Sequence, residues 1–346
     1  MTFSEILIHW YSNNKRELPW RKTKAPYYIW LSEIILQQTQ VNQGLPYYMS
    51  FIETFPSVFD LATADESEVL KLWQGLGYYS RARNLHATAR YVAEELNGTF
   101  PNNYKDLLKL KGVGDYTASA IASICFNEAT AVVDGNVYRA LSRYFGISTP
   151  INSSKGTKEF KALAQELIDK KNPAEFNQAI MEFGATQCKP QNPDCHICPF
   201  NKGCIAFNKG MIGELPVKIK SAKAKKKYFN FLVFISEDGK TVLEKREGKG
   251  IWQNLYQFPL IETNANVNAD TLETLIKEHH LIKGAPFELS LYNKDVVVHK
   301  LSHQHLYTKF WVVNVGKTLT EGIPTEDIHH YAVPILIGNF IEAFNF

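Results

Sequence analysis

The chain has 346 residues, of which 45% are hydrophobic and 21% charged, values typical of a soluble globular protein with two domains. Its net charge of +3 is compatible with nucleic-acid binding without requiring it. Charged residues interrupt the first apolar segment, and no apolar run reaches the length of a membrane span, so the sequence predicts neither a signal peptide nor a membrane anchor. We therefore expect a cytoplasmic protein with no membrane partner.

Two helices are predicted near the N-terminus. Residues 1–24 carry apolar side chains at helical spacing, and Pro26 favours the start of a second, strongly apolar helix that contains Glu33. A carboxyl group in such surroundings either pairs with a cation or has its pKa raised by desolvation, although most such glutamates simply lie on an exposed face. The glutamines that follow favour a polar groove, because long amide side chains are suited to hydrogen bonding with bases.

A stretch rich in glycine and aromatic residues follows further predicted helices. Residues 73–83 place Tyr78 in a glycine-containing turn before a helix, with Arg81 and Arg83 at the start of that helix. An aromatic ring in this position can wedge into a base stack, and the arginines can contact phosphates. A buried aromatic pair is the structural alternative.

Residues 107–120 predict two short helices joined by a turn with two glycines. The first helix ends at Gly112, and Gly114 allows a ligand to approach the backbone closely. Thr117 is predicted to open a second helix whose first amide groups attract an anion. Such a helix–hairpin–helix grips a DNA phosphate without reading sequence, although an ordinary helical corner has a similar pattern. Asp134 follows two valines farther along and is either a reactive carboxylate or a helix N-cap.

Residues 157–184 predict two more helices, in which Gln178 and Glu182 lie one turn apart and share a face. Four of the five cysteines then crowd into one window with spacing x6, x2 and x5: Cys188, Cys195, Cys198 and Cys204. In a reducing compartment this crowding favours a metal over disulfides. Zinc or a [4Fe–4S] cluster would fit four thiolates, and the spacing alone does not choose between them.

The character of the chain changes after residue 210. Residues 211–227 contain six lysines and no acid after Glu214, which predicts a basic linker that either follows a phosphate backbone or is a solvated tether. From residue 228 alternating patterns predict strands, with one helical segment near 270–280. This half resembles a Nudix (MutT-like) domain. Its helix lacks the Arg-Glu-x-x-Glu-Glu run that holds metal in Nudix hydrolases, so we expect the domain to bind rather than to hydrolyse.

The hairpin followed by Asp134 resembles the signature of the endonuclease III superfamily of DNA glycosylases, and the cysteine spacing resembles that superfamily's iron–sulfur loop. With the Nudix-like half, these motifs resemble the MutY-type adenine DNA glycosylases, enzymes of base excision repair, over nearly the whole chain. The resemblance implies a multidomain protein with an all-α helix–hairpin–helix glycosylase domain and an α+β Nudix-like lesion-recognition domain. The expected ranges are 1–210 for the glycosylase domain, with its hairpin at 107–120 and its iron–sulfur loop at 188–204, 211–227 for the basic linker and 228–346 for the Nudix-like domain. A [4Fe–4S] cluster on the four cysteines is implied as well.

The resemblance also implies catalytic roles. Glu33 would protonate adenine N7, Asp134 would stabilise or transiently bond to C1′ of the deoxyribose, and Tyr116 would position that carboxylate and the sugar. Strand-cutting members carry a lysine at the position of Tyr116, so we expect a monofunctional enzyme that leaves an abasic site. The chemistry requires one neutral and one ionised carboxyl group, because adenine must be protonated while the departing sugar becomes an oxocarbenium ion.

By the same resemblance, Arg16, Trp20 and Gln178 match positions in the family's base pocket. Gln38 and Tyr78 match residues that fill or wedge the base stack. Gly112 and Gly114 match the glycines of its hairpin. The segment Leu301-Ser302-His303 resembles the Phe-Ser-His that reads 8-oxoguanine, with leucine in place of phenylalanine. Ser302 is able to hydrogen-bond to the lesion, or it simply ends a strand. The implied partner is double-stranded DNA with adenine opposite 8-oxoguanine or guanine, and we expect the protein to bind it as a monomer.

Two other functions fit parts of the pattern. An endonuclease III-like glycosylase for oxidised pyrimidines would also cut the DNA strand, and Tyr116 together with the Nudix-like half argues against it. A non-catalytic DNA-damage sensor would keep the hairpin and the cysteines but would tolerate Glu33→Gln.

Overall fold

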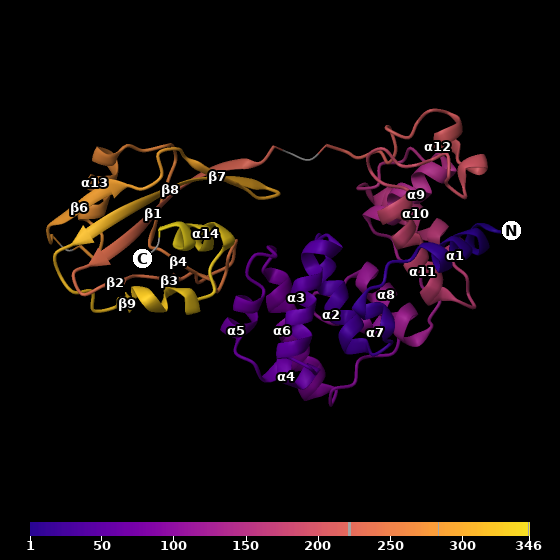
Figure 1. Cartoon of the computed structure of the whole chain (residues 1–346), viewed down its shortest axis with the longest axis horizontal. Coiled ribbons are helices and arrows are strands. Elements are labelled where there is room, and N and C mark those ends of the chain that lie inside the picture. The colour runs from indigo at the N-terminus through magenta and orange to yellow at the C-terminus, as the bar shows by residue number, and fades with distance from the viewer. Residues whose placement is uncertain (221–222, 283, 345) are drawn as a thin grey trace. The chain divides into compact units, whose positions relative to one another are not determined.

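The computed structural model describes residues 1–220, 223–282, 284–344 and 346, and these form two compact units (Figure 1). The first unit comprises Met1–Thr63 and Asn84–Lys220, and the second comprises Ala64–Arg83 and Ser221–Phe346. Each unit is described by itself below. Among the described residues, no helix is both long enough and apolar enough to span a membrane.

The first unit is helical. Its elements in chain order are α1 (Phe3–Asn14), η1 (Pro19–Lys22), α2 (Pro26–Leu36), α3 (Val41–Thr54), α4 (Val58–Thr63), α6 (Ser80–Glu95, which starts in the second unit), α7 (Tyr104–Leu107), α8 (Asp115–Phe126), α9 (Gly135–Phe145), α10 (Ser154–Leu167), α11 (Pro173–Glu182), the π-helical turn η2 (Phe183–Gln187), η3 (Asn201–Gly203) and α12 (Ile205–Asn208).

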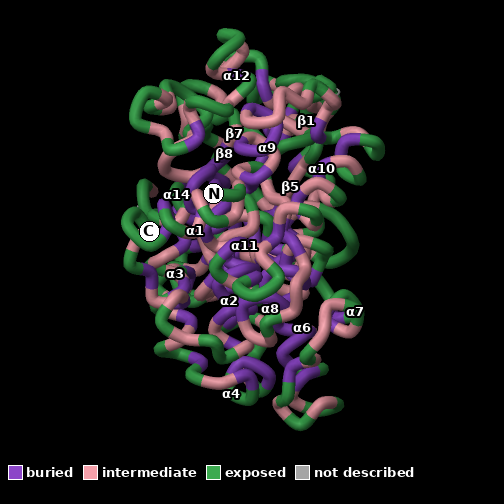
Figure 2. Tube along the Cα trace, turned by 90° about the vertical axis from the view of Figure 1, so that its right-hand side faces the viewer, coloured by how far each residue is buried: buried purple, intermediate pink, exposed green. Residues whose placement is uncertain are grey.

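The core of this unit lies around α2 and α8, which pack against each other (Figure 2). Both helices are apolar on nearly every face, and eight residues of each are buried. A helix that is apolar all round is stable only when neighbours cover it on every side. Helix α11 contacts α8 and provides part of that cover, and α1 and α9 contact α11 in turn. The functional side chains described below project from this buried pair and from the chain between α8 and α9.

The predicted hairpin is present as α7, a turn and α8. Gly112 has φ +80°, a left-handed conformation that side chains disfavour, and a Cβ atom on it would lie 2.8 Å from Cβ of Asn84. Gly114 is the N-cap of α8 and has ordinary extended angles, and a Cβ atom on it would meet no atom of the described residues within 4 Å. The second helix therefore begins at Asp115, two residues earlier than predicted, because the glycine N-cap leaves the first turn free to start there.

The second unit is an α+β domain. Its main sheet has the order β5-β1-β8-β6, with β7 also paired to β8. The long central strands β1 (Lys225–Ser236) and β8 (Gln304–Val315) are parallel. The other elements are α5 (Glu66–Leu72), β2 (Lys240–Thr241), β3 (Glu244–Lys245), β4 (Tyr256–Gln257), β5 (Leu260–Thr263), α13 (Ala269–Lys277), β6 (Phe287–Leu291), β7 (Val297–Lys300), β9 (Ile323–Pro324), η4 (Thr325–His330) and α14 (Ile335–Phe344).

The helical half followed by a strand-containing half is confirmed, but two details differ from the sequence prediction. Lys225 and its two lysine neighbours, predicted as part of the linker, belong to β1 and pair with the start of β8. Segment 64–83 belongs to the second unit, where the Tyr79 hydroxyl donates to Val333 O at 3.3 Å and Lys71 Nζ donates to Tyr331 O at 3.1 Å. Periodicity in a sequence identifies a helix but not the neighbour that it packs against.

Candidate active site

Two carboxyl groups from distant parts of the sequence share one pocket of about 150 Å3 in the first unit. Glu33 comes from the middle of α2, and Asp134 precedes the first residue of α9. Tyr116, from the first turn of α8, lines the same pocket. The convergence of these three residues, which their sequence positions could not establish, is a property of the fold.

Glu33 is buried among apolar residues, with 7% of its surface exposed. Burial raises the pKa of its carboxyl group from 4.5 to about 7, and the negative charge of Asp134 acts in the same direction. A hydrogen bond from Tyr116 and the charge of Arg21 oppose this rise. Near neutral pH a substantial fraction of Glu33 is therefore the neutral acid, which is the form that donates a proton.

Asp134 is the N-cap of α9, which was one of the two alternatives for this residue. Its Oδ1 accepts from the backbone N–H groups of Asn136 and Val137 at 2.9 and 2.8 Å, and its Oδ2 accepts from Asn136 Nδ2 at 2.8 Å. Burial raises the pKa of the carboxyl group, while these hydrogen bonds favour the ionised form and limit the rise. Capping fixes the orientation of the carboxylate and does not prevent it from facing the pocket.

Tyr116 shares the pocket with both acids and interacts with each of them. Its hydroxyl contacts Met181 Sδ at 3.0 Å and also hydrogen-bonds to Glu33, lowering the pKa of that carboxyl group. Burial together with the charges of Glu33 and Asp134 raises the pKa of Tyr116 well above its ordinary value. Tyr116 is therefore a neutral phenol with a single O–H to donate within the pocket.

Arg16, Trp20 and Gln178, which match the family's base pocket by resemblance, also line this pocket. The sequence did not reveal Glu182, whose fully buried carboxylate accepts from Arg16 Nε and Arg21 Nη2, each at 2.7 Å. Burial disfavours the charge, but the two guanidinium groups lower the pKa of Glu182 to about 2. The only sequence signal was that Glu182 shares a helix face with Gln178, since its cationic partners are more than 160 residues away in the sequence.

A larger groove of about 1200 Å3 shares Arg16, Tyr116 and Asp134 with the pocket. It is also lined by the α2–α3 turn, the start of α8 and residues 189–191. Gln38, which is exposed and has φ +57°, and Gly114 both line the groove. Gly112 lies in the hairpin turn but is not among the described residues that line the groove. A groove of this size that opens onto the pocket suits a large polymer from which one group is inserted.

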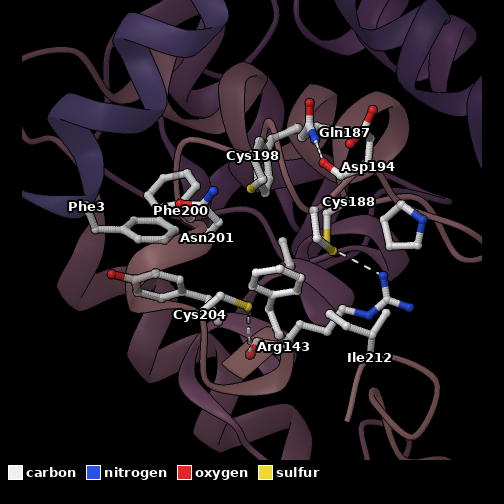
Figure 3. Close-up of a pocket in the computed structure, with 16 residues that line it drawn as sticks. Phe3, Arg143, Gln187, Cys188, Asp194, Cys198, Phe200, Asn201, Cys204 and Ile212 are labelled. Atoms are coloured by element: carbon white, nitrogen blue, oxygen red, sulfur yellow. Dashed lines mark hydrogen bonds between the residues drawn. The ribbon is translucent and has the colours of Figure 1, made fainter. Parts of the chain in front are cut away.

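The four clustered cysteines line a separate cavity of the first unit (Figure 3). Arg143 on α9 holds their loop, donating from Nη1 to Cys188 Sγ at 3.6 Å and to Lys189 O at 2.7 Å. Burial raises the pKa of the Cys188 and Cys198 thiols, that of Cys198 to about 11. Within the described ranges, no three His, Cys, Asp or Glu side chains converge closely enough to hold a single metal ion. The cysteines supply a four-sulfur donor set around one cavity, which fits a multi-iron cluster in its chemistry.

Comparison with known proteins places this chain in a family. The family model described as HhH-GPD superfamily base excision DNA repair protein matches residues 31–170, and the NUDIX domain model matches residues 230–343. Adenine DNA glycosylase of Buchnera aphidicola subsp. Schizaphis graminum is 36% identical over 317 residues, covering 91% of this chain and 88% of that protein. Adenine DNA glycosylase of Homo sapiens is 46% identical over 213 residues, 59% of this chain and 39% of the human protein. The chain belongs to the adenine DNA glycosylases.

A solved structure of a thermostable thymine-DNA glycosylase is similar to the helical half, with 32% identity and a TM-score of 0.56 over 60% of this chain and 95% of that one. The predictions of the family, of the helix–hairpin–helix fold and of a Nudix-like second half are confirmed. The glycosylase is an enzyme of base excision repair that hydrolyses an N-glycosidic bond in DNA.

The second unit of the glycosylase carries the two remaining predicted residues, Tyr78 and Ser302. Tyr78 is 52% exposed and has φ +47°, so its ring is presented at the surface. Arg81 is buried beneath it and donates to Leu76 O and Gly77 O, which makes this arginine a structural support and not the phosphate contact that the sequence suggested. Ser302 is exposed in the turn between β7 and β8, next to His303.

Proposed function

We propose that this glycosylase removes adenine paired with 8-oxoguanine or guanine in double-stranded DNA and leaves an abasic site. The observation that carries the proposal is the shared pocket of Glu33 and Asp134, in which two carboxyl groups have different surroundings. The names of the relatives, adenine DNA glycosylases, indicate the base that is removed. An adenine within a duplex must first leave the base stack in order to reach such a pocket.

Glu33 is the proposed general acid. Adenine is a poor leaving group until N7 is protonated, because the electron pair of the C1′–N9 bond must move onto the base. Glu33 transfers its proton to N7 as that bond breaks, and neutral adenine leaves. A carboxyl group with a pKa of about 7 is protonated in a substantial fraction of molecules at neutral pH and still releases its proton to a substrate.

Asp134 is the proposed partner of the sugar. The deoxyribose becomes an oxocarbenium ion, and a carboxylate held by three hydrogen bonds stabilises the positive charge at C1′ without reorganising. Water then adds to C1′, and its proton returns to the Glu33 carboxylate, which restores the acid. Tyr116 keeps the two carboxyl groups in place. The described residues that line the pocket include no lysine, in keeping with hydrolysis without a Schiff base.

DNA binding is assigned to the groove and the hairpin. The first amides of α8 meet a phosphate at Gly114, and Gln38 enters the space that the extruded base leaves. By the family resemblance, Tyr78 wedges into the base stack and Ser302 hydrogen-bonds to 8-oxoguanine. Both side chains are exposed, which supports these roles. In this proposal the Nudix-like domain recognises the lesion. The enzyme acts as a monomer in the cytoplasm, associated with the nucleoid.

Cys188, Cys195, Cys198 and Cys204 are the proposed ligands of a [4Fe–4S] cluster, which when bound orders their loop beside the groove. Arg143 and Arg139 hold this loop, Arg139 through the Cys188 carbonyl at 2.7 Å. Iron and acid-labile sulfide should be found in the purified protein in equal amounts, about four of each per chain. Stoichiometric zinc in place of iron would overturn this assignment.

The test of the proposed activity is an adenine-release assay under single-turnover conditions. Duplexes carry adenine opposite 8-oxoguanine, guanine or thymine. The first two should release adenine faster than the third, and strands should break only after added alkali. Strand cleavage without alkali would favour an endonuclease III-like enzyme, and tight binding without release of any base would favour a damage sensor.

A further inference from the structure

The chain that leads to Asp134 has unusual backbone partners. Residues 127–134 connect α8 to α9 and lie in no helix or strand. Within this connection, Ala131 and Val132 are nevertheless buried. A buried backbone segment outside a sheet still requires partners for its N–H and C=O groups. In this connection side chains from α10 and α11 provide them.

Gln165 on α10 and Asn177 on α11 each hydrogen-bond to one backbone N–H group and one backbone C=O group of the connection. Gln165 accepts from Ala131 N at 3.0 Å and donates to Ala129 O at 2.7 Å. Asn177 accepts from Val132 N at 3.1 Å and donates to Thr130 O at 2.8 Å. The two amides therefore imitate an adjacent β-strand, which would offer alternating donors and acceptors in the same way.

Lys161 completes this arrangement. Its ammonium group donates to Ala131 O at 2.7 Å and to Ser119 Oγ on α8 at 2.9 Å. Asn177, which is fully buried, also donates to Ser123 Oγ on α8 at 2.8 Å. The connection is thus tied to the helix that carries Tyr116 and, through Asn177, to the helix turn that carries Gln178.

We infer that Lys161, Gln165 and Asn177, here called the side-chain bracket, are positioning residues that set the place of Asp134 relative to Glu33 and Tyr116. The three side chains do not line the pocket. They act through the backbone, only two to five residues before the carboxylate. This inference rests on the proposed role of Asp134. A displacement of a reacting group by about 1 Å can reduce a rate by roughly a hundredfold, so a loosened bracket should affect chemistry before it affects binding.

The central variant is Gln165→Met, which keeps the approximate length of a half-buried side chain and removes both hydrogen bonds. Its matched control is Asn152→Leu. Asn152 holds Ile219 in the same manner, accepting from its N–H and donating to its C=O at 2.8 Å each, but lines neither the pocket nor the groove. Lys161→Met is the second bracket variant, in case the first is poorly folded. It also breaks an ion pair of 2.9 Å with Asp115, which lines the groove, so it is compared by its rate and its amide exchange and not by its DNA affinity.

Three measurements are made on the full-length protein at a temperature well below the midpoint of unfolding. They are the single-turnover rate of adenine release, the affinity for a duplex with an uncleavable 2′-fluorinated adenosine, and the hydrogen exchange of the Ala131 and Val132 amides. Gln165→Met should release adenine roughly tenfold more slowly, bind the uncleavable duplex within about twofold of the wild type, and exchange the Ala131 amide faster. Asn152→Leu should change only the exchange at Ile219.

An unchanged rate with faster amide exchange would overturn the positioning role, because the bracket would then be loosened without consequence for Asp134. Equal losses of rate and affinity would overturn it too, since they indicate a general structural defect. Asp134→Asn, measured in parallel, tests the proposed role of Asp134 itself. If that variant releases adenine at the wild-type rate, the proposed role of Asp134 fails, whatever the bracket variants do.

Discussion

The burial of the Glu33 side chain determines its chemical role. The carboxyl group lies within an apolar helix, where solvation no longer stabilises its charge, and it retains its proton to about pH 7. Gln in its place keeps the shape and the polar atoms but cannot transfer a proton to N7. Glu33→Gln should therefore slow adenine release by about 10²- to 10⁴-fold. Single-turnover assays measure this, with exposed Glu175→Gln on α11 as a control that should retain the wild-type rate.

The same group predicts the pH dependence of the rate. The active form has a protonated Glu33 and an ionised Asp134, so the rate of adenine release should fall as the pH rises through the Glu33 pKa of about 7. It should also fall at low pH, where Asp134, whose pKa is raised by burial, gains a proton. A pH–rate profile under single-turnover conditions measures the inflection. A profile that stays flat to pH 9 would show that Glu33 does not limit the reaction as an acid.

Stability should depend on pH through Glu33 as well. The folded protein binds this proton up to about pH 7, while the unfolded chain releases it near 4.5, so between these values the folded state holds more protons. The free energy of unfolding therefore contains a contribution that decreases as the pH rises from 4.5 to 7, by about 3 kcal/mol at most. Glu33→Gln should remove this slope, which urea unfolding at several pH values would detect.

At the residue scale, the sequence was informative where a motif carries a role. Tyr116 and Asp134 were singled out by their places in and after the hairpin, and Glu33 by its apolar helix and the family resemblance; all three line one pocket. Glu182 and Asn177 were not recognised as important. Their partners are far away in the sequence, and a buried ion pair or an amide that holds a backbone leaves no periodic signal.

The hairpin illustrates the scale of elements, because its two glycines serve different purposes. Gly112 has a left-handed φ of +80° and lies close to Asn84, whereas Gly114 has ordinary angles and open space toward the groove. Gly112→Ala should lower the free energy of unfolding by about 1–3 kcal/mol. Gly114→Ala should leave stability unchanged but weaken DNA binding, because its methyl group occupies the place where a phosphate approaches the backbone.

Thermal unfolding and DNA affinity, measured for both glycine variants, separate the two effects. If both variants lost stability equally, the hairpin would be a structural corner only, as one alternative from the sequence held. If neither changed DNA affinity, the phosphate contact would have to lie elsewhere in the groove.

Element types were predictable from periodicity, but the ends and partners of elements were not. Residues 127–134, which contain the apolar pair before Asp134, join neither a helix nor a sheet, because side chains from α10 and α11 hold their backbone groups. Likewise α8 begins at Asp115 and not at Thr117. Local propensity fixes neither feature, since both depend on contacts that form only when the helices have packed.

At the scale of the whole molecule, the division of the chain differs from its division by sequence pattern. Segment 64–83 lies within the range matched by the HhH-GPD family model but belongs to the second unit. Gln74 Oε1 accepts from Val333 N at 3.2 Å, and Asn254 Nδ2 donates to Glu66 Oε1 at 2.6 Å. The Nudix-like half therefore supports the turn that presents Tyr78, in addition to carrying Ser302.

This arrangement predicts that removing residues 221–346 does more than delete the reader of the lesion. The truncated chain loses the acceptor carbonyls of Tyr331 and Val333, which hold Lys71 and Tyr79, so segment 64–83 should become less ordered. The midpoint of thermal unfolding should fall, and the backbone amide of Trp73, fully buried in the intact protein, should exchange faster with solvent. Ser302→Ala in the full chain is the matched control, because it should reduce the preference for 8-oxoguanine over guanine and leave both properties unchanged. A truncated chain with the wild-type midpoint and the wild-type exchange rate at Trp73 would show that segment 64–83 needs no support from the second half.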